Sequence, residues 1–339
     1  MNTISLRGLL ASVLAGDAPR TMTCRRDRDG RAVALLGYGA MRLPTTDGGH
    51  ANPWGENAST ASIDQKRVNA LVDYLLEHGV NYFDTAPCYC RGESEHALGT
   101  ALTRHPREKY LLSTKLSNFA SAQYSADACR TMFENSLKSL KTDVIDYYYL
   151  HNIGKGGFAT FQKRYIDNGI LPWLFEQKAK GRIRHLGFSY HGDPKALEWV
   201  LARHDEGAYR WDMGLIQLNY VDWRHAKEVR ADNLNAKYLY DELTRRGIAV
   251  TVMEPLLGGR LARHHDAVMS VLAPLDPEAT PAKWAFRFVG SRPNVLTVLS
   301  GITYQEHAVE NVATFSPLKP LSPDEERALD RAAEIYLGY

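Results

Sequence analysis

Four polar residues in the first half of the chain could together transfer a proton to or from a carbonyl oxygen: Asp84, Tyr89, Lys115 and His151. A tyrosine has an ordinary pKa of about 10, which is too high for ready proton exchange near neutral pH. A nearby lysine ammonium would stabilise the phenolate and lower that pKa, and a carboxylate would hold the lysine in position. A histidine could orient a substrate oxygen or share the proton.

Each of these residues also has an explanation that involves no chemistry. Asp84 could cap the turn before Pro87, and Tyr89 could be a packing aromatic. Lys115 could be the solvated end of a strand, and His151 could be a structural histidine. Only their joint occurrence at the ends of successive strands favours a catalytic interpretation.

The elements that must position these residues are short β-rich runs that alternate with segments of helical period. We expect strands at Leu35–Met41, Asn81–Thr85, Tyr110–Thr114, Ile145–Leu150, Ile183–Phe188, Leu215–Asn219, Ile248–Met253 and Val295–Ser300. We expect helices at Asp64–His78, Glu93–Thr103, Ala126–Leu140, Leu171–Lys180, Pro194–His204, Leu234–Arg246, Pro281–Val289 and Gln305–Phe315. This strict alternation predicts an α/β fold, a (β/α)8 TIM barrel, in which residues just past the strand ends share one pocket.

Outside the barrel we expect a hairpin at the N-terminus, with Asp29-Gly30 as its turn, that could cap the barrel bottom, and a C-terminal helix within Ser322–Tyr339. Long connections are expected at Thr45–Ser62, Asn152–Asn168, Val221–Asn233 and Arg260–Thr280. Residues 1–20 suggest a leader or short helix, and residues 21–339 a single barrel domain. No G-x-G-x-x-G motif follows a strand, which argues against a doubly wound dinucleotide-binding fold.

Composition excludes several classes of protein. A net charge of +2 gives no indication of nucleic-acid binding or of a polybasic membrane surface. No apolar run approaches the about 18 to 20 residues that span a bilayer. Four irregularly spaced cysteines indicate free thiols in a reducing compartment, so we expect a cytoplasmic protein, although the N-terminus loosely imitates a secretory signal. Cys88 and Cys90 lack a second ligand pair, so we expect no metal site.

Motifs spread along residues 30 to 315 resemble the aldo-keto reductase superfamily. They are Gly37–Pro44, Asn81–Ala86 with Tyr89, Glu93–Gly99, Ser113–Lys115, Asp146–His151, Gly181–Ser189, Glu254–Gly259, Ser300–Ile302 and Glu310-Asn311. The resemblance implies that Asp84, Tyr89, Lys115 and His151 form the family's catalytic tetrad. It also implies hydride exchange between a nicotinamide and a carbonyl or alcohol, with Tyr89 as general acid or base and without a metal.

The resemblance also implies positions for the cofactor, NADP(H) or NAD(H), with NADP(H) the more common in the family. Ser189 and Gln217 would hold the nicotinamide carboxamide, and Arg260 would approach the pyrophosphate. The other expected contacts are Met253, Pro255, Leu256, Gly258, Ser300, Gly301, Thr303, His307, Glu310 and Asn311. A plain turn is the alternative explanation of Gly258-Gly259.

Three positions depart from the family pattern. Tyr190 stands where an asparagine usually holds the carboxamide, and His191 could replace that contact. Met253 stands in place of the usual stacking aromatic residue. Tyr304 occupies the position where many members carry a lysine or arginine for the 2′-phosphate, so Arg260, Arg263 or His307 would have to compensate.

The substrate is expected at aromatic and polar residues on the long loops, which could stack on a sugar or steroid face or simply pack. They are Trp54, Tyr190, His191 and Trp223. Gly187–His191 and Met253–Pro255 resemble a bacterial branch that often carries a cysteine-rich, ferredoxin-like tail. Such cysteines are absent here, so we expect no iron–sulfur cluster in this chain.

Two other functions remain open at this point. The same barrel could bind a nicotinamide nucleotide as a regulatory sensor, although the intact tetrad argues against that role. A metal-dependent barrel hydrolase is the other class, but the sequence offers no His-x-His or carboxylate cluster. We therefore expect a small-molecule carbonyl or alcohol as partner, with no nucleic acid and no membrane. The oligomeric state is not indicated.

Overall fold

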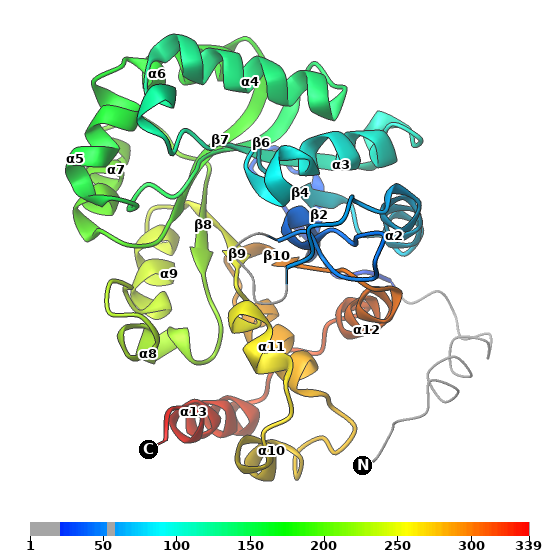
Figure 1. Ribbon diagram of the computed structural model, residues 1–339. Coiled ribbons are helices and arrows are strands. Elements are labelled where there is room, and N and C mark those ends of the chain that lie inside the picture. Colours follow the sequence, from blue (N-terminus) through cyan, green and yellow to red (C-terminus); the bar gives the residue numbers. More distant parts are fainter. Residues whose placement is uncertain (1–20, 53–57, 339) are drawn as a thin grey trace.

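The computed structural model describes residues 21–52 and 58–338. The predicted leader at residues 1–20 and Trp54 therefore lie outside the described residues. Eight parallel strands form a closed barrel in the order β10-β3-β4-β5-β6-β7-β8-β9 (Figure 1). The barrel strands are β3 (Leu36–Gly39), β4 (Tyr82–Asp84), β5 (Leu111–Leu116), β6 (Ile145–Leu150), β7 (Ile183–Tyr190), β8 (Met213–Gln217), β9 (Ala249–Met253) and β10 (Val295–Ser300). The predicted (β/α)8 barrel is confirmed.

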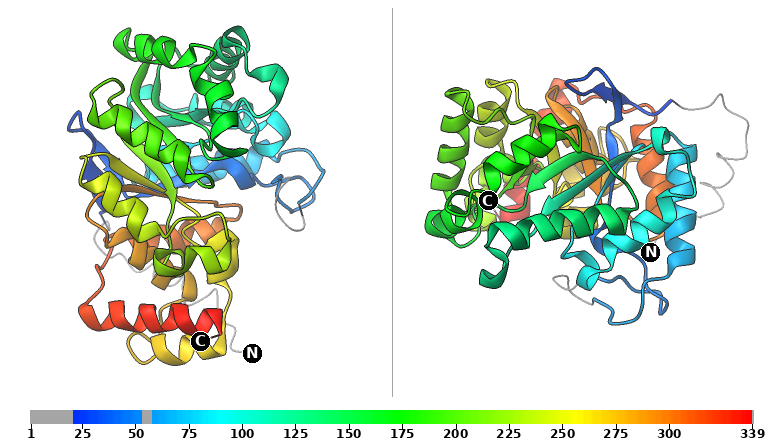
Figure 2. Two further views of the ribbon diagram at one scale, coloured as in Figure 1. Left: turned by 90° about the vertical axis from the view of Figure 1, so that its left-hand side faces the viewer. Right: turned by 90° about the horizontal axis from the view of Figure 1, so that it is seen from above.

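Helices surround the barrel, and all eight predicted helices are present (Figures 1 and 2). They are α2 (Gln65–Glu77), α3 (Ser94–Leu102), α4 (Ala126–Leu140), α6 (Ile170–Ala179), α7 (Pro194–Asp205), α9 (Ala236–Thr244), α11 (Pro281–Gly290) and α12 (Gln305–Phe315), followed by α13 (Pro323–Leu337). Among the described residues, no helix is both long and apolar enough to cross a bilayer.

Side-chain caps fix where several helices begin. Ser125 and Thr280 accept hydrogen bonds from backbone N–H groups of the first turns of α4 and α11. Ser322 and Glu325 form a reciprocal capping box at the start of α13. Each such cap satisfies N–H groups that have no partner within the helix, which typically contributes about 1 kcal/mol.

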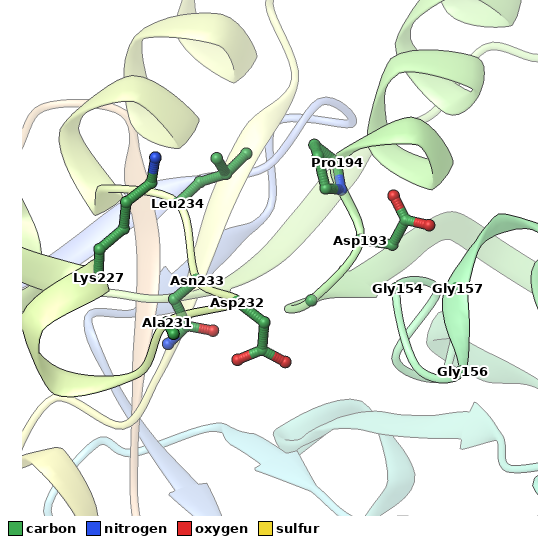
Figure 3. Close-up of a pocket in the computed structure, with 11 residues that line it drawn as sticks. Gly154, Gly156, Gly157, Asp193, Pro194, Lys227, Ala231, Asp232, Asn233 and Leu234 are labelled. Atoms are coloured by element: carbon green, nitrogen blue, oxygen red, sulfur yellow. The ribbon is translucent and has the colours of Figure 1, made fainter.

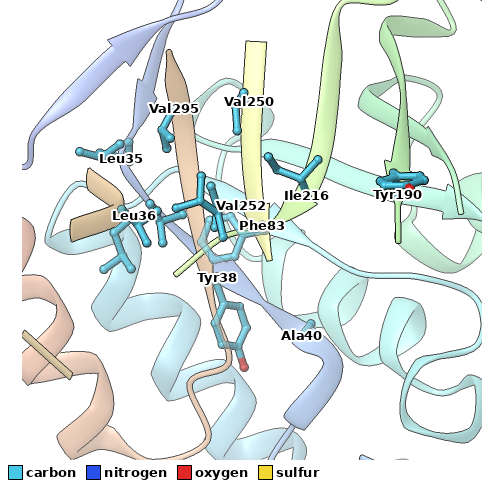
Figure 4. Close-up of a cluster of buried hydrophobic side chains, with 14 of the residues drawn as sticks. Leu35, Leu36, Tyr38, Ala40, Phe83, Tyr190, Ile216, Val250, Val252 and Val295 are labelled. Carbon is cyan, nitrogen blue, oxygen red and sulfur yellow. The ribbon is translucent and has the colours of Figure 1, made fainter. Parts of the chain in front are cut away.

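The pleat of the strands decides which residues face the barrel interior, because successive side chains point to opposite sides. Tyr82, Leu111, Tyr147, Tyr149 and Leu299 belong to a buried cluster that fills the barrel. The alternate positions face the helices, and Figure 4 shows such side chains from β3, β4, β8 and β9 gathered together, among them Leu36, Phe83, Ile216 and Val252. Asp84 and Lys115 share the phase of Tyr82 and Leu111, so they too point inward.

The predicted N-terminal hairpin is confirmed and lies at the N-terminal end of the barrel strands. Strands β1 (Cys24–Arg26) and β2 (Ala32–Ala34) pair antiparallel, and Gly30 adopts a φ of +80° in the turn. Asp27 accepts a hydrogen bond of 2.8 Å from the Tyr147 hydroxyl inside the barrel. The hairpin therefore closes the end of the barrel opposite the strand ends that carry Asp84 and His151.

Three connections that we predicted as long loops are partly helical instead. Residues 152–168 contain α5 (Gly157–Phe161) and a π-helical turn, η5 (Gln162–Ile166). The segment 221–233 contains α8 (Asp222–Val229), and the segment 260–280 contains η6 (Leu257–Ala262) in part and α10 (Asp266–Leu272). Each helix is only one or two turns long, so its apolar period was too short to recognise; tertiary burial of residues such as Phe161 and Trp223 stabilises it.

Candidate active site

The barrel brings the four predicted catalytic residues to one end of neighbouring strands. Asp84 ends β4, Lys115 is the penultimate residue of β5, and His151 directly follows β6. Tyr89 begins the short helix η2 (Tyr89–Gly92) after β4. Parallel pairing of β4 with β5 and of β5 with β6 sets these strand ends side by side. The predicted juxtaposition of these residues is thus present in the structure.

Asp84 and Lys115 form a buried ion pair. The Lys115 Nζ atom lies 2.5 Å from Oδ2 of Asp84 and 2.7 Å from the backbone oxygen of Thr85. Ser113, which precedes Lys115 by two residues on the same strand face, donates to Oδ1 of Asp84 over 2.6 Å. The two charged side chains are 0% and 3% exposed, so each depends on the other for compensation. Burial nevertheless raises the pKa of Asp84 above its ordinary value, against the opposing effect of Lys115.

Tyr89 lies between Lys115 and His151. The Lys115 ammonium is 4.7 Å from the centroid of the Tyr89 ring, and the His151 ring meets that ring edge-on at 5.8 Å. Burial, followed by the charge of Asp84, raises the pKa of Tyr89 well above its ordinary value. The pKa of Tyr89 is therefore raised overall, and not lowered as the adjacent lysine alone would predict. The reason is that Lys115 is already bound to Asp84, so burial outweighs its attraction for the phenolate.

His151 is held as a neutral imidazole. Its Nδ1 atom lies 2.6 Å from the hydroxyl oxygen of Ser117, and the Sγ atom of Cys88 is 3.9 Å from the same nitrogen. Burial lowers the pKa of His151 well below its ordinary value, and the positive charges of Lys115 and Arg164 add to this effect. With Nδ1 occupied by Ser117, the Nε2 atom is the nitrogen left for a substrate.

Arg164, which the sequence analysis missed, fixes the backbone that carries His151. It lies on the π-helical turn η5 and is 1% exposed. Its guanidinium donates to the backbone oxygens of His151 and Asn152, over 2.6 and 2.9 Å. No sequence motif marks this role, because an arginine 13 positions after His151 becomes its neighbour only when the connection folds back as a helix.

A cavity of about 600 Å³ opens beside Tyr89 and contains most of the predicted cofactor contacts. Asp84 and Tyr89 belong to its lining. The predicted cofactor residues among the lining are Met253, Pro255, Leu256, Gly258, Ser300, Gly301, Thr303, His307, Glu310 and Asn311. Gly258 and Gly259 adopt φ values of +69° and +94°, a conformation that favours glycine. This volume is in the range of small-molecule and cofactor sites.

Three predicted cofactor residues do not line this cavity. The Ser189 hydroxyl accepts a hydrogen bond of 2.7 Å from the backbone N–H of Asn152. Gln217 accepts from the Asn233 amide over 3.1 Å, and Arg260 donates to the backbone oxygen of Leu257. Their assignment to the carboxamide and the pyrophosphate stays a prediction. The cavity lining also includes residues that we did not predict, among them Arg42, His50 and Thr280.

The predicted substrate residues are scattered. Trp223 is buried in the core, where its ring packs against Tyr240 and Phe288, and its assignment to the substrate stays a prediction. Tyr190 is also buried, and its hydroxyl donates to the backbone oxygen of Gly192. His191 remains near the site, since its Nδ1 atom lies 3.3 Å from the Asn152 amide nitrogen next to His151.

A second cavity, of about 430 Å³, is formed by the connections after β6, β7 and β8. Its walls include Gly154, Asp193, Lys227 and Asp232. Figure 3 shows Lys227 on α8, Asp232 on the segment between α8 and α9, and Asp193 with Pro194 at the start of α7. This cavity shares no lining residue with the one beside Tyr89.

Among the described residues, no group of three or more histidine, cysteine, aspartate or glutamate side chains is arranged to hold a metal ion. The four cysteines are free thiols, and Cys90 is buried between the residues that follow β3 and β4.

Comparison with known proteins identifies the family. The model of the Aldo/keto reductase family matches residues 35–334. The chain belongs to this family. It is accordingly an NAD(P)H-dependent oxidoreductase.

Relatives of the aldo/keto reductase family resemble this chain over most of its length. L-galactose dehydrogenase from Arabidopsis thaliana is 25% identical over 314 residues, which cover 88% of this chain and 89% of the relative. The holo form of the aldo-keto reductase AKR11C1 from Bacillus halodurans is 23% identical, with a TM-score of 0.71 and coverage of 92% and 96%. An aldo-keto reductase from Klebsiella pneumoniae in complex with NADPH is 23% identical, with a TM-score of 0.66 and coverage of 92% and 95%.

Proposed function

We propose that this aldo/keto reductase reduces the carbonyl group of a small aldehyde or ketone to an alcohol, with Tyr89 as the general acid. One observation carries the proposal. Tyr89 and Asp84 line the same cavity as the Ser300–Asn311 segment, which the family resemblance assigns to the cofactor. A nucleotide held by that segment would thus share a cavity with the proton donor.

The state of Tyr89 suits proton donation. Because burial and Asp84 raise its pKa, the hydroxyl keeps its proton at neutral pH and can give it to the substrate oxygen. As the proton leaves, the Lys115 ammonium, 4.7 Å from the ring centroid, stabilises the developing phenolate. Oxidation of an alcohol would require Tyr89 to lose its proton first, so the arrangement favours reduction near neutral pH.

His151 can polarise the carbonyl without carrying a charge. Ser117 Oγ lies 2.6 Å from Nδ1; in the tautomer in which Ser117 donates to Nδ1, the ring proton lies on Nε2 and would donate to the substrate oxygen. Arg164 holds the backbone of His151 in place and, with Lys115, disfavours the imidazolium. His151 therefore orients the substrate, and Tyr89 supplies the proton.

The cavity residues fit a nicotinamide dinucleotide. Gly258 and Gly259 line the cavity without side chains that would fill it, and Ser300–Thr303 lead into helix α12. Glu310 and Asn311, on α12, would meet the adenine. When bound, the cofactor supplies a hydride from its nicotinamide to the carbonyl carbon.

Turnover assays test this function directly. The purified protein is mixed with NADPH or NADH and a panel of aldehydes and ketones, and loss of the reduced-nicotinamide absorbance is followed. We expect oxidation of the nicotinamide only when a carbonyl compound is present, unchanged by a chelator. Nucleotide binding without turnover on any compound of a broad panel would contradict the proposal and indicate a regulatory role.

A further inference from the structure

The cavity contains no lysine or arginine at the position where the family often binds the 2′-phosphate, since Tyr304 stands there. The structure shows that Tyr304 does not replace that cation. Its hydroxyl donates to the backbone oxygen of Gly48 over 3.0 Å, and its ring meets the edge of His307 at 5.2 Å. A positive charge for this phosphate must therefore come from another part of the fold.

Arg42, which follows β3, extends its side chain along the Ser300–Thr303 segment. A Cβ atom on Gly301 would lie 3.3 Å from Cδ and 3.8 Å from Nε of Arg42, so the missing side chain of Gly301 leaves room for the arginine. The Thr303 hydroxyl donates to the backbone oxygen of Arg42 over 2.8 Å and ties the two segments together. Arg42 thus lines the cavity beside the residues that lead into α12.

The charge of Arg42 is not paired with a carboxylate in the part of the chain that the structure describes. Within residues 21–52 and 58–338, its guanidinium forms no ion pair with a carboxylate, unlike Lys115, which is paired with Asp84. Among the described lining residues, Arg42 is the one lysine or arginine. His307 also lines the cavity, but burial lowers its pKa, so it is neutral at pH 7.

The carboxylates that line the cavity either accept hydrogen bonds already or lie away from Gly301. Glu310 accepts a hydrogen bond from the Thr280 hydroxyl, and it lies five residues into α12, about 7.5 Å along the helix axis from Gln305. Glu254 acts on the Tyr89 end of the cavity, where its charge contributes to the raised pKa of Tyr89. A dianionic phosphate beside Gly301 would therefore meet Arg42 rather than a carboxylate.

We propose that Arg42 binds the 2′-phosphate of the cofactor and gives this protein a preference for NADP(H) over NAD(H). The inference rests on the proposed function in that the cavity binds a nicotinamide dinucleotide. A guanidinium suits this ligand because its planar set of donors can form two charge-assisted hydrogen bonds with one phosphate. The residue that selects the cofactor thus ends the short turn after the first barrel strand, β3, which pairs with the last strand, β10.

Binding of two adenosine fragments tests Arg42 without any turnover. The dissociation constants of adenosine 2′,5′-bisphosphate and of 5′-AMP are measured by calorimetry for the wild type, Arg42→Gln, Arg42→Lys and the control Arg260→Gln. We expect the wild type to bind the bisphosphate at least about tenfold more tightly than AMP. Arg42→Gln should remove most of that ratio, Arg42→Lys should keep part of it, and Arg260→Gln should leave the ratio unchanged.

Three results would overturn the proposal. They are a wild type that binds both fragments equally, an Arg42→Gln variant that keeps the ratio, and a loss of the ratio in Arg260→Gln instead. Equal weakening of both fragments in Arg42→Gln would place the arginine at the 5′-phosphate and also reject the assignment. If Arg42→Gln does not fold, as judged by its thermal melting, the ratio of the two dissociation constants in the wild type and in Arg42→Lys still tests the proposal.

The fragments contain no nicotinamide, so this test is separate from the test of the proposed function. Selective binding of the bisphosphate by a protein that reduces no carbonyl compound would support the role of Arg42 in phosphate binding and contradict the proposed carbonyl reduction. Turnover with NADH and NADPH at equal efficiency, together with equal fragment affinities, would support the reductase and contradict the role of Arg42.

Discussion

The Ser117 hydroxyl oxygen lies 2.6 Å from the Nδ1 atom of His151. Ser117 directly follows β5 and continues the alternation of Ser113 and Lys115 on that strand. Ser113 and Lys115 bind Asp84, and Ser117 binds His151. One face of a single strand thus positions both the ion pair below Tyr89 and the histidine that would meet the substrate.

Removal of the Ser117 hydroxyl should impair the histidine without affecting the cofactor. In Ser117→Ala, Nδ1 loses its partner, and a mixture of ring tautomers becomes accessible. We expect kcat for carbonyl reduction to fall by about tenfold, because a positioned histidine contributes on the order of 10²-fold or more. The dissociation constant of NADPH should stay within twofold. Ser117→Thr keeps a hydroxyl and is the matched control; equal loss in both variants would argue for a packing role instead.

Removal of the Tyr89 hydroxyl should abolish turnover. Tyr89→Phe keeps the ring between Lys115 and His151 but removes the proton, so we expect kcat to fall by about 10² to 10⁴-fold. Fluorescence titration with NADPH should show nearly unchanged affinity. A variant that keeps most of its activity would show that another group supplies the proton. Tyr82→Phe, which removes a buried hydroxyl bound to Tyr149 in the barrel, controls for the loss of a tyrosine hydroxyl.

The ion pair between Asp84 and Lys115 should matter for stability as well as for catalysis. Lys115→Met leaves a buried carboxylate without its partner, which typically costs about 3–5 kcal/mol of unfolding free energy. Urea denaturation would measure this loss. Asp84 has a raised pKa in the folded state, so it binds a proton more readily there than in the unfolded chain. In Lys115→Met the folded state should therefore lose further stability as the pH rises. A loss that is the same at pH 5 and pH 8 would contradict this account.

The pH dependence of reduction should be flat around neutrality. Tyr89 has a raised pKa and keeps its proton up to at least its ordinary value of about 10. His151 has a lowered pKa and stays neutral down to below its ordinary value of about 6.5. We therefore expect kcat/KM for reduction to change little between about pH 6 and pH 9. A titration with a midpoint near pH 7 would show that one of the two pKa directions is wrong.

The sequence predicted the barrel and the approach of the candidate catalytic residues for a simple reason. Strands with apolar residues on both faces alternate with helices, and such units place the ends of all strands at one rim. Asp84, Lys115 and His151 sit at those ends, so their approach follows from strand boundaries alone. The boundaries of β6 and β10 agree with the prediction residue for residue.

The sequence did not predict the short helices or the burial of the aromatic side chains that they carry. Trp223 looked like a loop residue available to a substrate, but α8 is a two-turn helix that turns it into the core against Phe288. A segment of eight residues is too short for its hydrophobic pattern to distinguish such a helix from a polar loop. The same holds for the π-helical turn that carries Arg164.

The sequence by itself therefore determined which residues stand at the strand ends, because local apolar patterns define each strand. Only the tertiary structure decided the electrostatic state of those residues and the neighbours that act on them. Burial raises the pKa of Tyr89 although a lysine lies beside it, and burial depends on every element packed around the site. Arg42 reaches Gly301 and Thr303, 261 positions from Thr303 in sequence, because the first and last barrel strands become neighbours only when the barrel closes.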